Sequence, residues 1–352
     1  MAEEEFVDLR PEGEQEKKKK SGCLVFLIVV LSLLLVALFV VAVGMNYIFG
    51  RLGRFENPTP GETVAMLPED TETDPPENVA GLETMDATDV TFETVGVLEG
   101  DVINIMLIGQ DRRPGEERAR SDSMILVSMN KAEGTLRLTS FMRDLYVQIP
   151  GYLDNRLNAA FRYGGTDLMN ETFKVNFGLE IDGNVMVDFD EFTEIIEILG
   201  GVTLDISSAE AKYMNSNSKN RFSAGTNYFN AEDALTFTRM RYAAGGDYGR
   251  TDRQRRVLMA IAESFRNADI RTLWTAIEEI LPHIVTNLDN AQIIEYATTG
   301  LGILGSGAQI ETLRIPQDDA HKGASIRGMS VLVPNLEKCR EDLQEFIYES
   351  DN

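Results

Sequence analysis

The pattern of hydrophobic and polar positions begins with one long apolar run. Residues 22–50 contain no charged side chain, and a helix needs about 20 such residues to cross the roughly 30 Å hydrocarbon core of a bilayer. A cleaved signal peptide has a shorter apolar region, of about 7–15 residues. The run therefore predicts a transmembrane helix at 22–50. Four lysines at 17–20 precede it, so the positive-inside tendency predicts a cytoplasmic tail at 1–21 and an extracellular remainder.

The next fifty residues show no lasting helical or strand period. Residues 51–100 contain twelve acidic residues, two arginines and five prolines. Low hydrophobicity with high charge is typical of an extended chain rather than of a core. We expect an acidic extracellular linker that holds a folded domain away from the membrane, with room for one strand at Val90–Leu98.

Short apolar runs alternate with amphipathic segments from Asp101 onward. The strand-like runs are 102–108, 123–129, 135–142, 184–189 and 202–206. The helical patterns are 166–177, 192–199, 252–265, 273–284 and 291–301. Strands and helices of these lengths predict a three-layer α/β or an α+β domain.

Composition narrows the classes of function. The formal net charge is -24, whereas a nucleic-acid-binding surface is basic, so we expect no nucleic-acid partner. Cys23 lies in the apolar run and Cys339 near the other end of the chain, so no intrachain disulfide is expected. His283 and His321 belong to no zinc-binding motif.

One segment is rich in arginine although the chain as a whole is acidic. Residues 239–256 contain six arginines and no lysine. A guanidinium is a planar fork of donors that binds two phosphate or carboxylate oxygens at once. Glycines on both sides of Asp247 allow the backbone to bend around a ligand. The segment predicts a phosphate-binding site, and the alternative is an exposed helix whose arginines form salt bridges. Arg239 and Arg241 can act together only if the preceding helix ends near Arg239, because positions two apart diverge on a helix.

Further polar residues lie at the ends of the predicted strands. Asp111 follows the first strand, Arg120 and Asp122 flank the start of the second, and Arg143 follows the third. If these strands are neighbours, the two carboxylates can reach one cation with the arginines beside it. Mg²⁺ is commonly bound by one or two carboxylates together with phosphate oxygens. The alternative is that each is a solvated loop charge or a helix cap.

The motifs together resemble a known family. The array NIMLIGQDRR, RSDSMIL, SFMRDLYVQIPG, NAAFRYGG, LGGVTLDI, ALTFTRMRY and GDYGRTDRQRRVL is similar to the LytR-CpsA-Psr family. The similarity covers a core at 101–266 of a predicted catalytic domain at 101–352 and continues more weakly toward the C-terminus. It implies a three-layer α/β/α domain with a central mixed sheet and a long hydrophobic groove, preceded by one transmembrane helix.

The resemblance also implies an activity. Members of this family are Mg²⁺-dependent phosphotransferases of the Gram-positive cell envelope. They move a glycopolymer from an undecaprenyl-pyrophosphate carrier onto peptidoglycan, usually at the muramic acid 6-hydroxyl. Teichoic acid, capsule polysaccharide and other polymers all remain open here. The expected localisation is the cell membrane, with a single span, a cytoplasmic N-terminus and an extracellular catalytic domain.

The resemblance assigns roles to individual residues. Asp111 and Asp122 match the metal-binding acids, and Asp247 matches an acid that helps to deprotonate the acceptor. The residues expected to bind pyrophosphate are Arg120, Arg143, Arg239, Arg241, Arg250 and Gln254, of which Arg120 and Arg241 are also expected to act in catalysis. Two departures from the family pattern, Met142 and Asn230-Ala231, remove no catalytic group.

Two other functions remain open from the sequence. A hydrolase would cut the same lipid pyrophosphate with water as the acceptor and would use the same phosphate and metal groups. A non-catalytic sensor of polyprenyl phosphates would be marked by loss of the Asp and Arg positions, and none is lost here.

Overall fold

The computed structural model describes residues 47, 49–55, 76–93, 95–110, 119–240 and 246–349, with the backbone alone at 76, 77, 247, 270, 273 and 274. The chain divides into two units, Met1–Arg51 and Leu52–Asn352. The predicted membrane span lies almost wholly outside the described residues. Among the residues that are described, no helix has the length and apolar character needed to cross a membrane.

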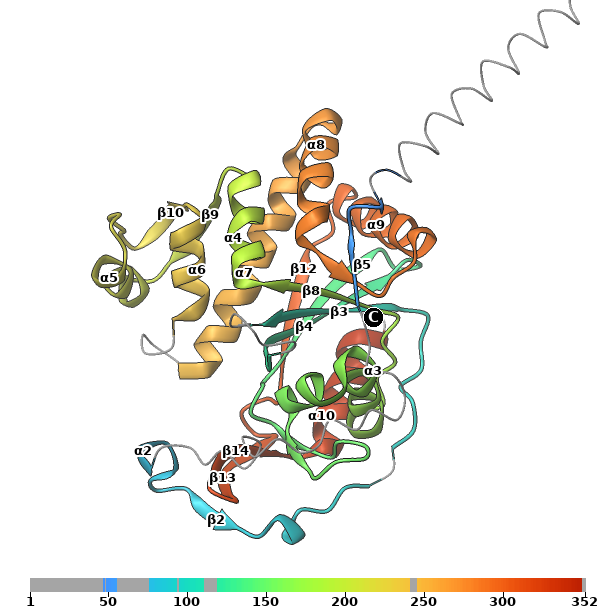
Figure 1. Ribbon diagram of the computed structural model, residues 1–352, viewed down its shortest axis with the longest axis vertical. Helices are drawn as coiled ribbons and strands as arrows, with labels where there is room; N and C mark the ends of the chain where they lie inside the picture. Colours follow the sequence, from blue (N-terminus) through green and yellow to red (C-terminus); the bar gives the residue numbers. More distant parts are fainter. Residues whose placement is uncertain are drawn as a thin grey trace, which may run out of the picture. The chain divides into compact units, whose positions relative to one another are not determined.

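A seven-stranded mixed sheet forms the centre of the second unit (Figure 1). Its order is β1-β11-β8-β3-β4-β5-β12. The bounds are β1 Gly53–Arg54, β3 Ile103–Gln110, β4 Ser121–Asn130, β5 Thr135–Phe141, β8 Gly183–Asp188, β11 Val285–Thr286 and β12 Ile310–Ile315. Strands β3 and β8 are parallel, as are β5 and β12, whereas β4 is antiparallel to both of its neighbours. The predicted α/β class is confirmed.

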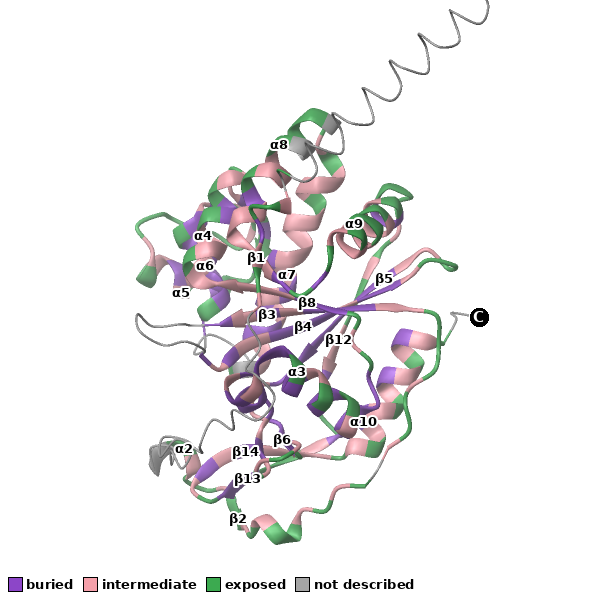
Figure 2. Ribbon diagram, turned by 45° about the vertical axis from the view of Figure 1, so that its right-hand side comes forward, coloured by how far each residue is buried: buried purple, intermediate pink, exposed green. Residues whose placement is uncertain are grey.

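Helices cover both faces of the sheet (Figure 2). One face contacts α3 (Leu157–Phe177) and α10 (Leu336–Leu343), and the other contacts α7 (Gly246–Asn267) and α9 (Asn290–Gly305). The two-residue period of β3 explains this, because Met106 joins the first core and Ile105 the second.

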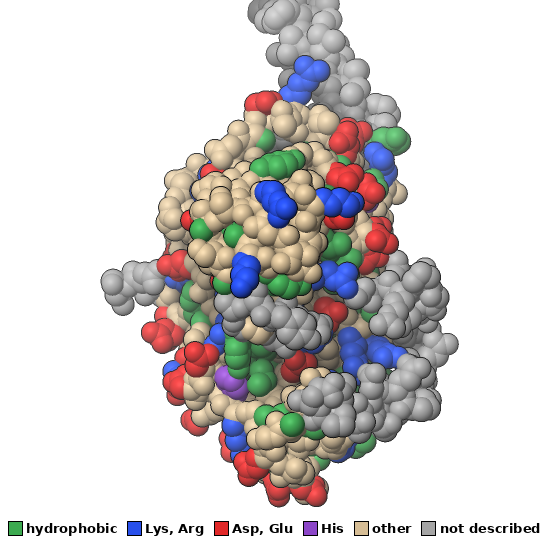
Figure 3. Space-filling view, turned by 90° about the vertical axis from the view of Figure 1, so that its left-hand side faces the viewer, with side chains coloured by type: hydrophobic (Ala, Val, Ile, Leu, Met, Phe, Trp, Pro, Cys, Tyr) green, Lys and Arg blue, Asp and Glu red, His purple; other side chains and the backbone are tan. Residues whose placement is uncertain are grey.

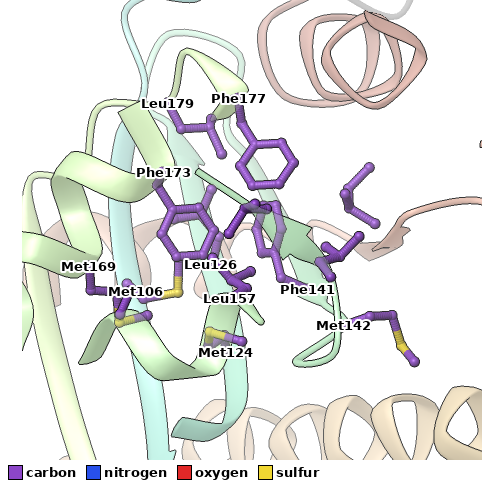
Figure 4. Close-up of a cluster of buried hydrophobic side chains, with 14 of the residues drawn as sticks. Met106, Met124, Leu126, Phe141, Met142, Leu157, Met169, Phe173, Phe177 and Leu179 are labelled. Carbon is purple, nitrogen blue, oxygen red and sulfur yellow. The ribbon is translucent and has the colours of Figure 1, made fainter. Parts of the chain in front are cut away.

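The first core is rich in methionine and phenylalanine (Figure 4). The rings of Phe141 and Phe173 meet edge to face, with their centroids 4.8 Å apart. Cys339 lies fully buried in this core, and burial raises the pKa of its thiol to about 12. It is a packing residue rather than a reactive thiol.

A smaller lobe packs beside α7 around a separate hydrophobic cluster. It consists of α4 (Phe189–Ile198), β9 (Val202–Ile206), α5 (Ser208–Asn217), β10 (Gly225–Phe229) and α6 (Ala231–Arg239). Next along the chain after α7 come α8 (Ile270–Ile280) and the 3-10 turn η3 (Leu281–His283).

The described part of the expected linker packs on the domain. Besides β1, it contributes α2 (Pro76–Val79), β2 (Glu83–Met85) and η2 (Ala87–Asp89). Strand β2 pairs with β13 (His321–Ile326), which pairs with β14 (Met329–Pro334). The strand expected at Val90–Leu98 is not found among the described residues of that stretch. A short hairpin, β6 (Tyr146–Val147) and β7 (Asn155–Arg156), and the π-helical turn η4 (Gln344–Tyr348) complete the domain.

Candidate active site

Polar residues lie where the strands of the central sheet end, and these strand ends are side by side along one margin of the sheet, which is called the sheet edge below. Strands β3, β5, β8 and β12 end there and β4 begins there, because Gln110 pairs with both Ser121 and Asp188, and Ser140 pairs with Arg314. Figure 3 shows the side of the domain toward which β3 and β8 run. Basic side chains lie in the middle of this face, and acidic side chains lie mostly toward its margin.

Arg143 and Asp122 meet at this edge. Arg143 follows β5, and its Nη1 donates to Asp122 Oδ1 over 2.5 Å. The two side chains are 18% and 25% exposed, so the charges are only partly screened by water. Arg120 lies just before β4, two residues from Asp122. The condition set by the sequence, that the three strands be neighbours, is met.

Asp144 lies close to the guanidinium groups of both Arg143 and Arg156. Its Oδ1 lies 3.6 Å from Arg143 Nε and 3.8 Å from Arg156 Nε. Arg156 in turn donates from Nε and Nη2 to the Ser330 carbonyl, at 3.1 and 2.8 Å. The carboxylate therefore links Arg143 to a side chain that is anchored on β14.

Helix α6 ends at Arg239, as joint action of Arg239 and Arg241 requires. Met240 leaves the helix with φ -58° and ψ 122°. Arg239 is exposed, and its guanidinium carbon lies 4.7 Å from the centre of the Phe189 ring at the start of α4. Sequence reasoning missed Phe189, although its place directly after β8 puts it at the same sheet edge.

Helix α7 supplies Arg250 and Gln254. These residues are four positions apart and so share one side of the helix. Gln254 Oε1 accepts a hydrogen bond from Ser123 Oγ over 3.1 Å, which fixes α7 against β4. Arg250 is 4% exposed. Both predicted phosphate-binding residues thus lie on the element that covers the sheet edge.

The other arginines of the segment form internal ion pairs, as the alternative interpretation proposed. Glu210 Oε1 lies 2.8 Å from Arg256 Nη1 and 3.6 Å from Arg253 Nη1. Arg253 also donates to the Met240 carbonyl over 2.5 Å. Burial lowers the pKa of Arg253, and Glu210 partly offsets this effect. Arg255 lies 3.5 Å from Asp252.

Three predicted site residues have no described side chain. Asp111 and Arg241 lie outside the described residues. Asp247 is in the first turn of α7, but its side chain is not described. No group of three or more His, Cys, Asp or Glu side chains suited to a metal is found in the described part of the chain. The assignments of these residues stay predictions.

An apolar cavity lies next to the arginine-bearing edge. Its volume is about 300 Å³, and it lies among the sheet, α4, α7 and α8. Its walls include Leu107, Ile125, Val185, Val187, Phe192, Ile195, Val257, Leu258, Ile261, Phe265, Ile280 and Ile284. Its few polar contributors include Ser123, Asp188 and Gln254. A ligand with an apolar tail and an anionic head fits this combination.

Comparison with known proteins decides the family. The model of the LytR_cpsA_psr family matches residues 71–345. The chain belongs to this family. The LytR-CpsA-Psr match begins before Asp101, in agreement with the packing of β2 on the domain.

Named relatives within the family fall into two groups. A polyisoprenyl-teichoic acid–peptidoglycan teichoic acid transferase, TagU of Bacillus cereus, is 30% identical over 66% of this chain and 74% of its own length. The regulatory protein MsrR of Staphylococcus aureus is 27% identical over 70% of this chain and 75% of its own.

Solved structures of the family share the fold. Bacillus subtilis TagV aligns with a TM-score of 0.58 and 27% identity, over 72% of this chain and all of that one. A structure of YwtF (TagT) with bound octaprenyl pyrophosphate lipid aligns with a TM-score of 0.55 and 23% identity. It covers 73% of this chain and 97% of that one, and at this identity the likeness shows the fold alone.

Proposed function

We propose that this protein transfers a glycopolymer from an undecaprenyl-pyrophosphate carrier to the muramic acid 6-hydroxyl of peptidoglycan. The observation that carries the proposal is the junction of an apolar cavity with an arginine-bearing sheet edge. A polyprenyl tail leaves water in the cavity, while its pyrophosphate stays at the polar end. The name of the TagU relative supports this assignment.

The pyrophosphate-binding group comprises Arg120, Arg143, Arg239, Arg241, Arg250 and Gln254. The substrate carries negative charge, and more develops on the lipid phosphate as it leaves. Guanidinium groups held in place by neighbouring carboxylates, as Asp122 and Asp144 hold Arg143, neutralise that charge without reorganisation. The pyrophosphate linkage is already activated, so no further energy source is needed.

Asp122 suits a role in binding Mg²⁺. It is a partly exposed carboxylate at the phosphate-facing edge, which is a usual donor for this ion beside phosphate oxygens. Asp111 is the second predicted ligand. When bound, the ion adds positive charge next to the phosphates. Asp247 remains the acid that the family pattern places near them.

The decisive experiment follows a labelled glycan on its lipid carrier. Full-length protein in detergent is incubated with the labelled lipid-pyrophosphate glycan, Mg²⁺ and peptidoglycan. We expect the label to become covalently attached to peptidoglycan. Release of soluble phosphorylated glycan without attachment would indicate the hydrolase, and lipid binding with neither product would indicate the sensor.

We further propose that the chain is anchored in the cell membrane by residues 22–50, with the catalytic domain outside the cell. The support is the charge-free apolar run and the lysines before it. Glycopolymers and peptidoglycan meet on that side of the membrane.

A further inference from the structure

The segment that the sequence predicts to be a linker is connected to the sheet edge by a series of contacts. Its strand β2 is the outer strand of a small sheet with the order β14-β13-β2 (Figure 1). Thr84 of β2 is paired with Ser325 of β13, and Ser325 is paired with Ser330 of β14. The Ser330 carbonyl oxygen accepts hydrogen bonds from Nε and Nη2 of Arg156. One row of paired residues therefore leads from the linker to Arg156.

Arg156 extends this series to Arg143. The hairpin of β6 and β7 holds Arg156 opposite Tyr146. A single oxygen, Asp144 Oδ1, lies 3.8 Å from Arg156 Nε and 3.6 Å from Arg143 Nε. The side chains of Asp144, Arg143 and Arg156 are 20%, 18% and 13% exposed, so water screens these charges only in part. The position of the Asp144 carboxylate therefore depends on Arg156, and that of Arg143 depends on Asp144.

The backbone of Arg143 and Asp144 is fixed by the same strand and by α3. The Asp144 carbonyl accepts a hydrogen bond from the Leu332 N–H of β14 over 2.9 Å. The Arg143 carbonyl accepts one from the Asn158 N–H, in the first turn of α3, over 3.2 Å. Strand β14 thus contacts Asp144 directly through its main chain and indirectly through Arg156. A displacement of β14 would move the Asp144 carboxylate and the Arg143 guanidinium with it.

Apolar side chains of the linker complete the small core on which β14 rests. Residues 83–92 are called the strap. Met85, Val90 and Phe92 of the strap pack on a cluster that contains Tyr146 and side chains of β13 and β14. The ring centres of Phe92 and Tyr146 are 6.4 Å apart, and Tyr146 is fully buried. Tyr146 is only two residues from Asp144, so the strap keeps water from a core that adjoins the candidate site.

We propose that Asp144 and Arg156 are positioning residues for Arg143, and that the strap is part of this support rather than a spacer. The proposal rests on the proposed function, in which Arg143 binds the pyrophosphate. Guanidinium groups stabilise developing phosphate charge most when they are already in place. A displacement of about 1 Å can lower the rate about a hundredfold. Asp144 and Arg156 act only through Arg143 and do not contact the substrate.

The direction of the effect of Asp144→Asn distinguishes positioning from a simple charge effect. The negative charge of Asp144 by itself opposes the binding of an anion, so its removal alone would tighten the binding of octaprenyl pyrophosphate. Asparagine has nearly the same shape but does not attract two guanidinium groups. If Asp144 positions Arg143, the same substitution therefore weakens binding.

A double-mutant cycle on the full-length protein in detergent tests the positioning role. The affinity for octaprenyl pyrophosphate is measured for the wild type, Asp144→Asn, Arg143→Gln and the double variant. We expect Asp144→Asn to weaken binding about tenfold in the wild type and less than about twofold in the Arg143→Gln background. Thermal unfolding is followed in parallel, because a general loss of stability would lower the affinity equally in both backgrounds.

Asp342→Asn is the matched control for Asp144→Asn. Asp342 also forms an ion pair, 2.7 Å from Lys338 Nζ on α10, and its side chain is 12% exposed. We expect its affinity for octaprenyl pyrophosphate to equal that of the wild type.

Phe92→Ala tests the strap in the same assay. Loss of the ring that packs on Tyr146 should weaken binding about fivefold in the wild type and less than about twofold in the Arg143→Gln background. Phe92→Leu keeps most of the apolar contact and should bind nearly as well as the wild type. Val97→Ala is the control from the same stretch, since Val97 is 43% exposed and lies outside the strap.

Each outcome decides one part of the proposal. Unchanged or tighter binding by Asp144→Asn would overturn the positioning role, as would an equal loss in both Arg143 backgrounds. Normal binding by Phe92→Ala would show that the strap is only a spacer. A wild type that binds the lipid but transfers no glycan would refute the proposed function alone, because the cycle is measured by binding. A wild type that does not bind the lipid would overturn both.

Discussion

At the scale of single residues, the arginines of the 239–256 segment divide by the groups they contact. Arg253 and Arg256 bind the buried Glu210, and Arg255 lies near Asp252. Arg239 instead lies exposed on the Phe189 ring, beside the cavity. The salt-bridge alternative that the sequence left open therefore holds for Arg253, Arg255 and Arg256, whereas phosphate binding stays the proposed role of Arg239.

Arg143→Lys tests the need for a guanidinium at the sheet edge. Lysine keeps the charge, but a single ammonium cannot bind Asp122, Asp144 and a phosphate in the same planar arrangement. We expect transfer to fall about a hundredfold, equivalent to roughly 3 kcal/mol for one preorganised donor. The measurement is the rate of glycan attachment to peptidoglycan.

Arg266→Lys is the matched control for this change. Arg266 forms an ion pair with Glu263 on the same helix, 2.9 Å away and far along α7 from the sheet edge. We expect its transfer rate to equal that of the wild type and its free energy of unfolding to fall by about 1 kcal/mol, because the Nη2 hydrogen bond to the Ala308 carbonyl is lost. Equal rates for the two lysine variants would show that Arg143 does not bind the pyrophosphate.

At the scale of elements, the buried carboxylate of Glu210 joins the middle of α7 to the smaller lobe. Burial opposes ionisation of Glu210, but hydrogen bonds from Arg256 and from the Ser207 backbone outweigh this effect and lower the pKa of the carboxyl group. Arg256 also donates to the Asp205 carbonyl. Helix α7 is therefore joined to β9 and α5 through charges that have left most of their water.

Glu210→Gln should weaken this junction in a pH-dependent way. The folded pKa lies below the ordinary value of 4.5, so ionised Glu210 stabilises the fold above that pH. The contribution is lost as pH falls through the lowered folded pKa. We expect a free energy of unfolding about 3 kcal/mol lower at pH 7, because buried Arg253 loses its partner.

Denaturant titrations from pH 7 down to acid check this expectation. The difference between wild type and Glu210→Gln should shrink as the pH falls below 4.5. Glu232→Gln is the control, since Glu232 is 76% exposed and lies 3.9 Å from Lys219. It should change stability by less than about 1 kcal/mol at any pH. A difference for Glu210→Gln that grows with acid would contradict the assignment.

Filling the cavity tests its role in lipid binding. Ile261→Trp places a larger side chain into the space of about 300 Å³ beside α8. We expect binding of octaprenyl pyrophosphate to fall at least about tenfold, because the tail can no longer leave water there. Ile294→Trp on α9 is the control, since Ile294 is 44% exposed. Equal lipid affinity of the two tryptophan variants would place the lipid elsewhere.

The sequence predicted some elements better than others, for physical reasons. Strands β3 and β4 contain continuous apolar runs because both of their faces are covered, and such runs are easy to recognise. Strand β12 is the last strand of the sheet beyond β5, and its sequence mixes apolar residues with Glu311, Thr312 and Arg314, so its pattern was not recognised. Strand β2 lies in an acidic stretch and is fixed by pairing with β13, more than 200 residues away.

The sequence likewise predicted one part of the candidate site and missed another. Asp122 lies at the start of β4 and Arg143 just after the end of the neighbouring strand β5, so their proximity follows from strand order alone. The cavity depends on how α4, α7 and α8 pack against the sheet. The contacts of Arg156 with Asp144 and with the Ser330 carbonyl depend on the position of strand β14. No local pattern encodes these distances, because the partners are joined only through the folded sheet.

At the scale of the whole molecule, the proposed orientation of the membrane span determines on which side of the membrane the transfer reaction takes place. Residues 22–50 carry no charge, Lys17, Lys18, Lys19 and Lys20 precede them, and only Arg51 and Arg54 follow closely. Each cationic side chain that must cross the bilayer opposes insertion, so the end with more of them stays inside. We expect the N-terminus in the cytoplasm and the domain outside the cell.

Reporter fusions test this orientation. A phosphatase that is active only outside the cytoplasm, fused after residue 352, should be active in cells, and a fusion partner that works only in the cytoplasm should be active at the N-terminus. A variant with the four lysines replaced by glutamine and four lysines inserted after Gly50 should reverse both signals in a measurable fraction of molecules, because the charge difference across the span has changed sign. The same four lysines inserted far from the span, after residue 352, should leave the orientation unchanged. Phosphatase activity only at the N-terminus of the unmodified chain would place the arginine-bearing edge in the cytoplasm, where peptidoglycan is absent, and would rule out the transfer reaction.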